Sequence, residues 1–307
     1  MTHTIKLLGP RAETLLGFLT ALGALKVLED ISPAVKMAWA PSGSGWIAEL
    51  HVPSAIFSDA TSVTEYIFNK LDKTKHPVLE WERFLTKTFS DESEFFRSSV
   101  LETLSLTNSS RTSFTPVFSS QMPVEQMDTQ EHFDHPFRAA RKDYYLGNLK
   151  SIIENTTLEH LTRSLVRPWD YRDAMANQSL RLDHGDDRRH AYQWHAPTED
   201  PARQKSGCML GANRLAIESF PLFPCIPKKD GGAAVGFKCN SKTYTWITWP
   251  VWEQPCSLPV IFGLLNLSEL QGEAFPEKLR AMGIVAVFRS RRLPVEKNKV
   301  FLPPVPL

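Results

Sequence analysis

Residues 4–9 (TIKLLG) and residues 15–28 (LLGFLTALGALKVL) decide how the chain begins, because they predict a short strand followed by a core helix. In the second stretch, apolar residues recur every three or four positions, which is the period of an α-helix. Gly17, Ala21 and Ala24 form a stripe of small residues within it. Small side chains allow another backbone to approach closely, so we expect this helix to pack tightly under a sheet.

The segments that follow predict a hairpin and two more helices. Residues 35–40 and 45–52 have strand character and flank a stretch rich in turn residues. Ser62 and Glu65 have the spacing of a capping box, so a helix is expected to begin near Ser62. Another helix is expected over residues 92–104.

A Ser- and Thr-rich stretch, residues 105–121, predicts a boundary between an N-terminal lobe, 1–121, and a C-terminal lobe, 122–307. Residues 167–207 are irregular and long for a loop, which is typical of a functional or disordered segment. In the second lobe we expect helical periodicity over 137–166 with a break near Gly147, a helix over 211–219, strands over 234–239 and 244–252, a helix over 277–282 and a strand over 284–288. The expected fold class is α+β, with mixed helices and small antiparallel sheets in two lobes.

The composition is that of an ordinary globular protein. The 307 residues include 35 Lys+Arg and 34 Asp+Glu, for a formal net charge of +1, and 42% are hydrophobic. Such a chain is not basic overall, although acidic residues elsewhere can mask a local basic face. No apolar run approaches the roughly 18 residues that a membrane-spanning helix needs. We therefore expect a cytoplasmic protein without a membrane partner.

Two clusters of His and Asp raise the possibility of a metal-dependent nuclease, which needs a cation to activate water beside a phosphate. The first contains His132, Asp134 and His135, and the second lies in residues 183–195. Neither has the spacing of a familiar metal motif, and arginines within and beside the second cluster favour a salt-bridged or contact loop. No phosphate-binding loop and no nucleophile motif is present, so neither a cofactor nor a catalytic residue is predicted.

The C-terminus is locally basic. From residue 278 onward there are seven basic residues (Lys278, Arg280, Arg289, Arg291, Arg292, Lys297 and Lys299) and one acid, Glu296. Arginine suits phosphate because its planar fork can hold two oxygens. In a strand, Arg289 and Arg291 are expected on one side and Arg292 on the other. This run is either a solvated edge or a contact for a nucleic-acid backbone.

The tryptophans of the second half allow two interpretations. Trp169, Trp194, Trp246, Trp249 and Trp252 could stack nucleic-acid bases, or they could belong to the core.

Four stretches are similar to CRISPR-associated subunits of type I-G (formerly I-U) systems. They are residues 8–26 (LGPRAETLLGFLTALGALK), 186–194 (DDRRHAYQW), 211–218 (GANRLAIE) and 283–292 (GIVAVFRSRR). The chain is much shorter than the usual large subunit of that subtype, which leaves open whether it is a compact large subunit or an accessory relative.

The resemblance implies a non-catalytic subunit of a Cascade-type effector complex in antiviral defence. Its partners would be guide RNA, target DNA and other Cascade subunits, with a separate helicase–nuclease doing the cutting. The candidate nucleic-acid contacts are Arg289, Arg291, Arg292, Lys297, Lys299, Arg181, Arg188, Arg189 and Arg214. The alternatives are the metal-dependent nuclease using residues 132–135 and 183–195, and a purely structural interaction protein.

Overall fold

Three strands within residues 2–53 form an antiparallel sheet that is buried on one side. Its strands are β1 (Thr2–Arg11), β2 (Lys36–Ser42) and β3 (Gly45–Pro53), in the order β1-β3-β2. Alternate residues such as Leu7, Leu50 and Val52 are buried, as the period of a strand requires. The hairpin predicted for this region is confirmed.

The computed structural model describes residues 2–71 except 30, 33 and 44, together with residues 73, 76, 136–139, 142–174, 179–183, 207–228, 231–240, 243–295 and 298–307. The helix predicted over 92–104, the boundary at 105–121 and most of the irregular stretch 167–207 lie outside these residues.

The predicted core helix, α1 (Leu15–Glu29), is buried on nearly every side. It packs against α11 (Leu210–Ser219), and the closest approach is at Gly23, where any added Cβ would collide with the carbonyl of Leu215. Thr20 donates a hydrogen bond to the carbonyl of Ala212 on the same side. The contact with α11 therefore runs along Thr20 and Gly23, beside the stripe of small residues that the sequence suggested.

A second sheet contains the C-terminal strands. These are β8 (Phe237–Asn240), β9 (Thr243–Trp252), β10 (Ile284–Val295) and β11 (Asn298–Phe301), in the order β11-β10-β9-β8, with β12 (Val305–Pro306) also paired to β10. The basic run Arg289–Arg292 continues the apolar strand without a break. The strand predicted over 234–239 is interrupted at Gly236, whose φ of 76° makes a turn between β7 (Gly231–Ala234) and β8.

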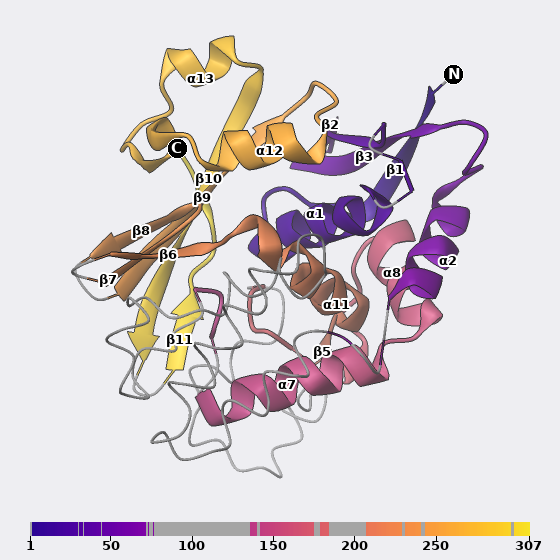
Figure 1. The fold of residues 1–307 in the computed structure, drawn as a ribbon, viewed down its shortest axis with the longest axis horizontal. Coiled ribbons are helices and arrows are strands. Elements are labelled where there is room, and N and C mark those ends of the chain that lie inside the picture. The colour runs from indigo at the N-terminus through magenta and orange to yellow at the C-terminus, as the bar shows by residue number, and fades with distance from the viewer. Residues whose placement is uncertain are drawn as a thin grey trace, which may run out of the picture.

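An aromatic cluster joins the two sheets into one core. Phe18 contacts the rings of Trp39, Trp249 and Trp252. The indole N–H of Trp249 donates to the carbonyl of Ala12 at 2.8 Å, and that of Trp252 donates to the carbonyl of Met37 at 2.9 Å. Both side chains are buried, so base stacking is the wrong interpretation for these two tryptophans. The described parts of the two predicted lobes share this core (Figure 1).

The remaining elements surround this core. They are α2 (Ala60–Lys70), α7 (Lys142–Asn155), α8 (Leu158–Val166), η3 (Phe220–Leu222), α12 (Leu258–Leu265), η4 (Ser268–Gln271) and α13 (Glu277–Ala281), with the two-stranded ladders β4 (Asp173–Ala174) with β5 (Gly207–Cys208) and β6 (Cys225–Lys228) with β7. The fold is therefore α+β, as predicted.

Two expected helix boundaries differ from the structure, one by two residues and the other by eight. The capping box of α2 is formed by Asp59 and Ser62, so Ser62 is the third helical residue and not the cap. The break in the 137–166 region follows Asn155, where Thr157 caps α8, whereas Gly147 lies inside α7. In both places a hydrogen-bonding side chain, and not the nearest glycine or serine, decides where the helix begins.

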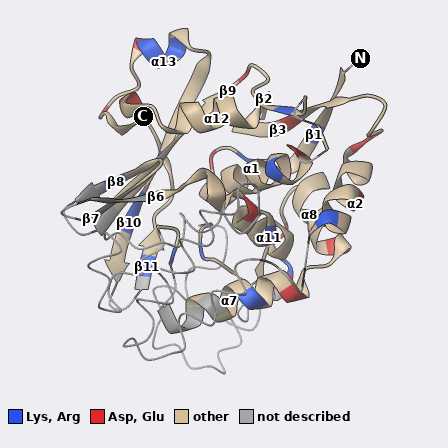
Figure 2. Ribbon diagram, in the orientation of Figure 1, with Lys and Arg blue, Asp and Glu red and all other residues tan. Residues whose placement is uncertain are grey.

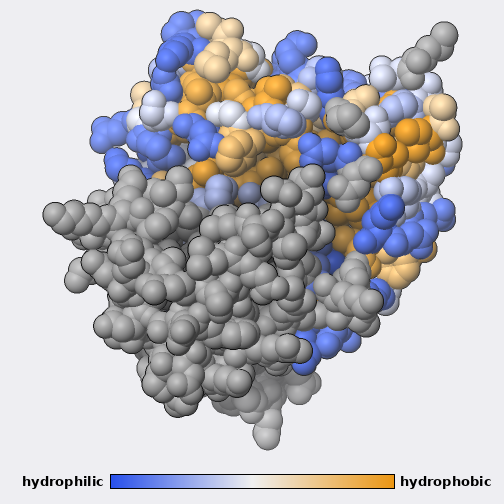
Figure 3. Space-filling model, in the orientation of Figure 1, coloured by the Kyte–Doolittle hydropathy of each residue, from blue (hydrophilic) through white to orange (hydrophobic). Residues whose placement is uncertain are grey.

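The outer side of α12 is apolar and exposed. Val260 is 50% exposed and Phe262 is 38% exposed. Figure 3 shows hydrophobic residues at the surface in the part of the molecule where Figure 1 places α12. Among the described residues, no helix is both long and apolar enough to span a membrane.

Candidate nucleic-acid interface

The strand register brings basic and aromatic side chains into one row across the C-terminal sheet. Trp246 of β9 lies opposite Lys238 of β8 and opposite Arg291 of β10. Residues directly opposite one another in antiparallel strands project from the same side of the sheet. Arg289, two residues before Arg291 on the same strand, shares that side, as the sequence predicted. We call Lys238, Trp246, Arg289 and Arg291 the Trp246 face.

The ring of Trp246 is in contact with two cations. Lys238 Nζ lies over the ring, 4.6 Å from its centroid, and Arg289 Cζ lies 5.0 Å from the same point. Both distances are within the range of a cation–π interaction, which stabilises a cation by the negative face of the ring. The indole N–H is buried and has no hydrogen-bond partner among the described residues. The polar edge of Trp246 therefore points inward.

Arg289 is held in a fixed position by its hydrogen bonds. Its Nε donates to Thr248 Oγ1 at 3.0 Å, and its Nη2 donates to the carbonyls of Leu270 at 3.0 Å and Gly272 at 2.6 Å. Partial burial desolvates the guanidinium and lowers the pKa of Arg289 from its usual value, while the nearby charge of Glu273 acts in the opposite direction. An arginine remains charged at neutral pH under such conditions, so Arg289 combines a structural role with a fixed positive charge.

Arg291 differs from Arg289 because its side chain is exposed. In the described part of the chain, neither Arg291 nor Lys238 forms an ion pair with a carboxylate. Lys and Arg residues mark β10 in Figure 2. These two cations are the ones on the Trp246 face that are available to an anionic ligand.

Two predicted contact residues are buried and take structural roles instead. Arg292 is 2% exposed and donates to the carbonyl of Arg138 at 3.0 Å, on the opposite side of the sheet from Arg291. Arg214 is 1% exposed and forms an ion pair with Glu218 one helical turn along α11. A buried guanidinium is not accessible to a phosphate. The prediction that Arg292 and Arg214 contact nucleic acid is therefore wrong, and both are interior residues.

Of the remaining predicted contacts, the structure describes Arg181 and Lys299, and neither belongs to the Trp246 face. Arg181 is partly buried and has a left-handed backbone, with φ of 58°. Lys299 is partly buried on β11, where its backbone N–H donates to the carbonyl of Ala139 at 3.0 Å. Arg188, Arg189 and Lys297 lie outside the described residues.

The partner of Arg214 belongs to a buried ionic cluster. Glu218 accepts from Arg214 and lies 3.0 Å from Nε2 of His76, which is itself buried. Burial would raise the pKa of the Glu218 carboxyl, but the charges of Arg214 and His76 outweigh this and lower it to about 2. The cluster holds His76 against α11.

The residues expected in the nuclease interpretation are only partly described. His132, Asp134, His135 and the stretch from His184 to His195 lie outside the described residues. Asp183, the first member of the second cluster, is buried and accepts a hydrogen bond from the Tyr171 hydroxyl at 2.7 Å. Within the described part of the chain, no group of three or more His, Cys, Asp or Glu side chains could hold a metal ion.

A further polar cluster, centred on Asp173, is structural. Asp173 accepts from Arg163 of α8 and, at 2.7 Å, from the backbone N–H of Leu210 at the start of α11. Trp169, one of the tryptophans considered for stacking, donates its indole N–H to the carbonyl of Ser164 at 2.9 Å. These contacts tie α8 and α11 together. Trp194 lies outside the described residues.

Lys238 is the member of the Trp246 face that the sequence analysis missed. It stands eight positions before Trp246, and nothing in a lone lysine indicates function. The strands predicted over 234–239 and 244–252 indicate that Lys238 lies near Trp246, but its exact pairing depends on a register shift between Lys238 and Cys239 that the sequence does not indicate.

Comparison of the chain with protein-family models, with curated proteins and with solved structures gives no match.

Proposed function

We propose that this chain is a non-catalytic subunit of an RNA-guided CRISPR effector complex of the Cascade type, and that it contacts nucleic-acid backbone through the Trp246 face. The observation that supports this is the row formed by Lys238, Trp246 and Arg291, in which two cations that pair with no carboxylate of the described residues flank an aromatic ring. The resemblance of residues 283–292 to type I-G subunits falls on the strand that carries Arg291.

The geometry of the row suits a chain of phosphates. Neighbouring strands are about 4.8 Å apart, so the backbones of Lys238 and Arg291, one strand to either side of Trp246, are about 10 Å apart. Each cation that neutralises a phosphate releases counterions, and this favours binding regardless of the base sequence. Arg291 offers a planar fork and Lys238 a point charge, and both can bind phosphate oxygens.

A backbone contact of this kind fits a subunit that does not itself read sequence. In RNA-guided complexes the base pairs between guide and target provide specificity, and the protein holds the strands by their phosphates. The partners in this proposal are guide RNA, target DNA, other subunits of the complex and a separate helicase–nuclease. The proposed location is the cytoplasm. No step of catalysis is assigned to the chain.

Co-purification from the native host tests this proposal. We expect the tagged full-length chain to retain a set of partner subunits and an RNA of uniform length, both in fixed proportion to the chain. Cleavage of nucleic acid by the isolated chain in the presence of a divalent cation would contradict the proposal and favour the nuclease. Partner proteins without RNA would favour a purely structural subunit.

A further inference from the structure

The environment of Trp246 limits what this side chain can do. Lys238 Nζ and Arg289 Cζ both lie over its ring, and its indole N–H is buried. Neither cation is drawn away by an ion pair with a carboxylate among the described residues. The ring therefore attracts two positive charges even in the absence of a ligand.

From this geometry we infer that the Trp246 face binds phosphates and does not stack bases, with Trp246 as a positioning residue for Lys238 and Arg289. The inference rests on the proposed function and narrows its ligand class to the phosphate backbone of a nucleic acid, whichever bases it carries. It also separates Trp246 from the aromatic platforms of proteins that bind single strands, in which exposed rings stack on successive bases.

Because both cations lie over the ring, a base that stacked on it would compete with them. Displacing Arg289 would break its three hydrogen bonds to Thr248, Leu270 and Gly272. Displacing Lys238 would remove a charge that the phosphates require. Stacking and phosphate binding therefore compete at this face, whereas in a stacking platform they add together.

The test compares two probes on the full-length chain. One is a fluorescently labelled single-stranded oligothymidine, and the other is an abasic oligonucleotide of the same length and charge. One stacked base contributes roughly fivefold to 150-fold in affinity. We expect the wild-type protein to bind the two probes with affinities that differ by less than about fivefold, the lower limit for a single stacked base.

Substitution of Trp246 provides the decisive comparison. Trp246→Leu should weaken binding of both probes by the same factor, because it removes the ring that positions Lys238. A preference of the wild type for the thymidine probe that Trp246→Leu abolishes would overturn the inference. The ratio of the two affinities is measured on one preparation, so it does not depend on the folded fraction. Trp246→Met, which also lacks a ring, should leave the ratio unchanged and serves if the leucine variant does not fold.

Failure of the proposed function gives a different result. The variant Lys238→Ala/Arg291→Ala should lose affinity for both probes. If it binds both as tightly as the wild type does, or if the wild type binds neither, nucleic-acid contact at this face is contradicted whatever the ratio. If the double variant loses affinity and the ratio depends on Trp246, the proposed function stands and only the inference fails.

Discussion

The guanidinium of Arg289 lies 5.0 Å from the centroid of the Trp246 ring and donates to the carbonyl of Gly272, so one side chain links β10, β9 and the turn after η4. Arg291, two residues further along the same strand, is exposed and has no such anchors in the described structure. The side chains of these two arginines project from the same side of the sheet but have different roles.

Arg289→Ala is therefore expected to destabilise the protein, whereas Arg291→Ala is not. Loss of the hydrogen bonds from Arg289 leaves the carbonyls of Leu270 and Gly272 without their charged donor, which costs about 1–3 kcal/mol of unfolding free energy. A substitution at an exposed position typically changes it by less than about 0.5 kcal/mol. Urea unfolding of the two variants compares them directly. Equal losses of stability would contradict the structural role of Arg289.

The close approach of α1 and α11 predicts that any replacement of Gly23 lowers the stability of the protein. A Cβ at this position would lie far inside van der Waals contact with the carbonyl of Leu215, so Gly23→Ala must push the helices apart. We expect a loss of about 1–3 kcal/mol or more in thermal or urea unfolding.

Gly147 is the matched control for this change. It lies inside α7 with no atom within 4 Å of an added Cβ, and alanine is the better helix former. Gly147→Ala should stabilise the protein by about 0.5–1 kcal/mol. If both variants show the same change in stability, the tight contact at Gly23 is wrong.

Part of this fold could be predicted from the sequence because its signals are local. The spacing of apolar residues over 15–28 can be read from that segment alone, and it predicts α1 to within one residue of its observed end. The same holds for the hairpin of β2 and β3 and for β9, where alternation and β-branched or aromatic residues agree.

The roles of the arginines could not be predicted, because they depend on burial and tertiary contacts that no local pattern gives. Arg292 differs from Arg291 through a carbonyl at Arg138, and Arg214 is stabilised inside the protein by Glu218 and so does not reach the surface. Alternation along a strand gives the direction of Arg289 and Arg291 but not what covers them. Lys238 is recognised as a member of the Trp246 face only from the strand register that places it beside Trp246.

The buried cluster around Glu218 predicts a loss of stability in acid. Its carboxyl has a pKa of about 2 in the folded protein and 4.5 as the ordinary value, so the unfolded chain binds the proton more readily. The stabilising contribution is therefore complete above about pH 4.5 and is lost as the pH falls towards about 2. Glu218→Gln should remove this contribution and flatten the decline of unfolding free energy within that window.

Glu218→Gln should also lower the free energy of unfolding at neutral pH. Removing one partner of a buried ion pair typically costs about 3–5 kcal/mol, because the other charge stays buried. Replacing both partners, as in Arg214→Met/Glu218→Leu, should recover a large part of this loss. A Glu218→Gln variant that unfolds like the wild type at pH 7 and at pH 3 would contradict the buried ionic cluster.

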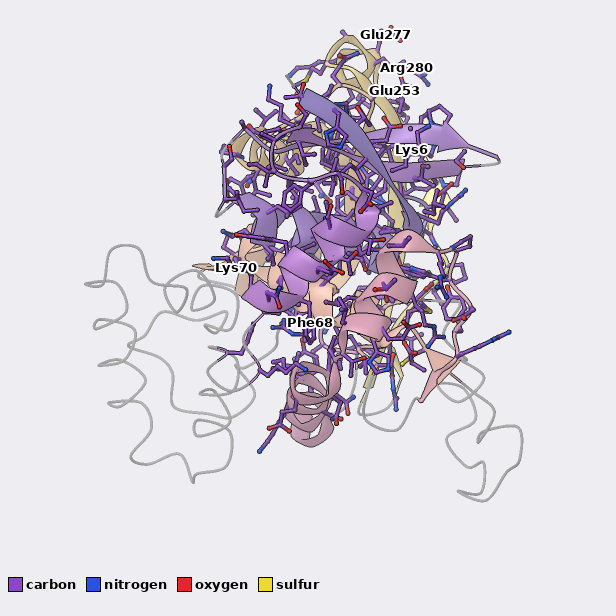
Figure 4. All side chains as sticks on the ribbon, turned by 90° about the vertical axis from the view of Figure 1, so that its right-hand side faces the viewer. Lys6, Phe68, Lys70, Glu253, Glu277 and Arg280 are labelled. Atoms are coloured by element: carbon purple, nitrogen blue, oxygen red, sulfur yellow. The ribbon has the colours of Figure 1, made fainter. Side chains whose placement is uncertain are left out.

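The salt dependence of nucleic-acid binding tests the central claim most directly. Lys238→Ala/Arg291→Ala is compared with Lys6→Ala/Lys70→Ala, which removes the same charge from β1 and α2, on the side of the molecule shown in Figure 4. Each lost phosphate contact lowers the slope of log K against log salt by about 0.7 for a single strand, so the first variant should lose about 1.4. The control variant should keep the slope of the wild type. If Lys238→Ala/Arg291→Ala also keeps that slope and its affinity, the Trp246 face does not bind phosphate and the account is contradicted.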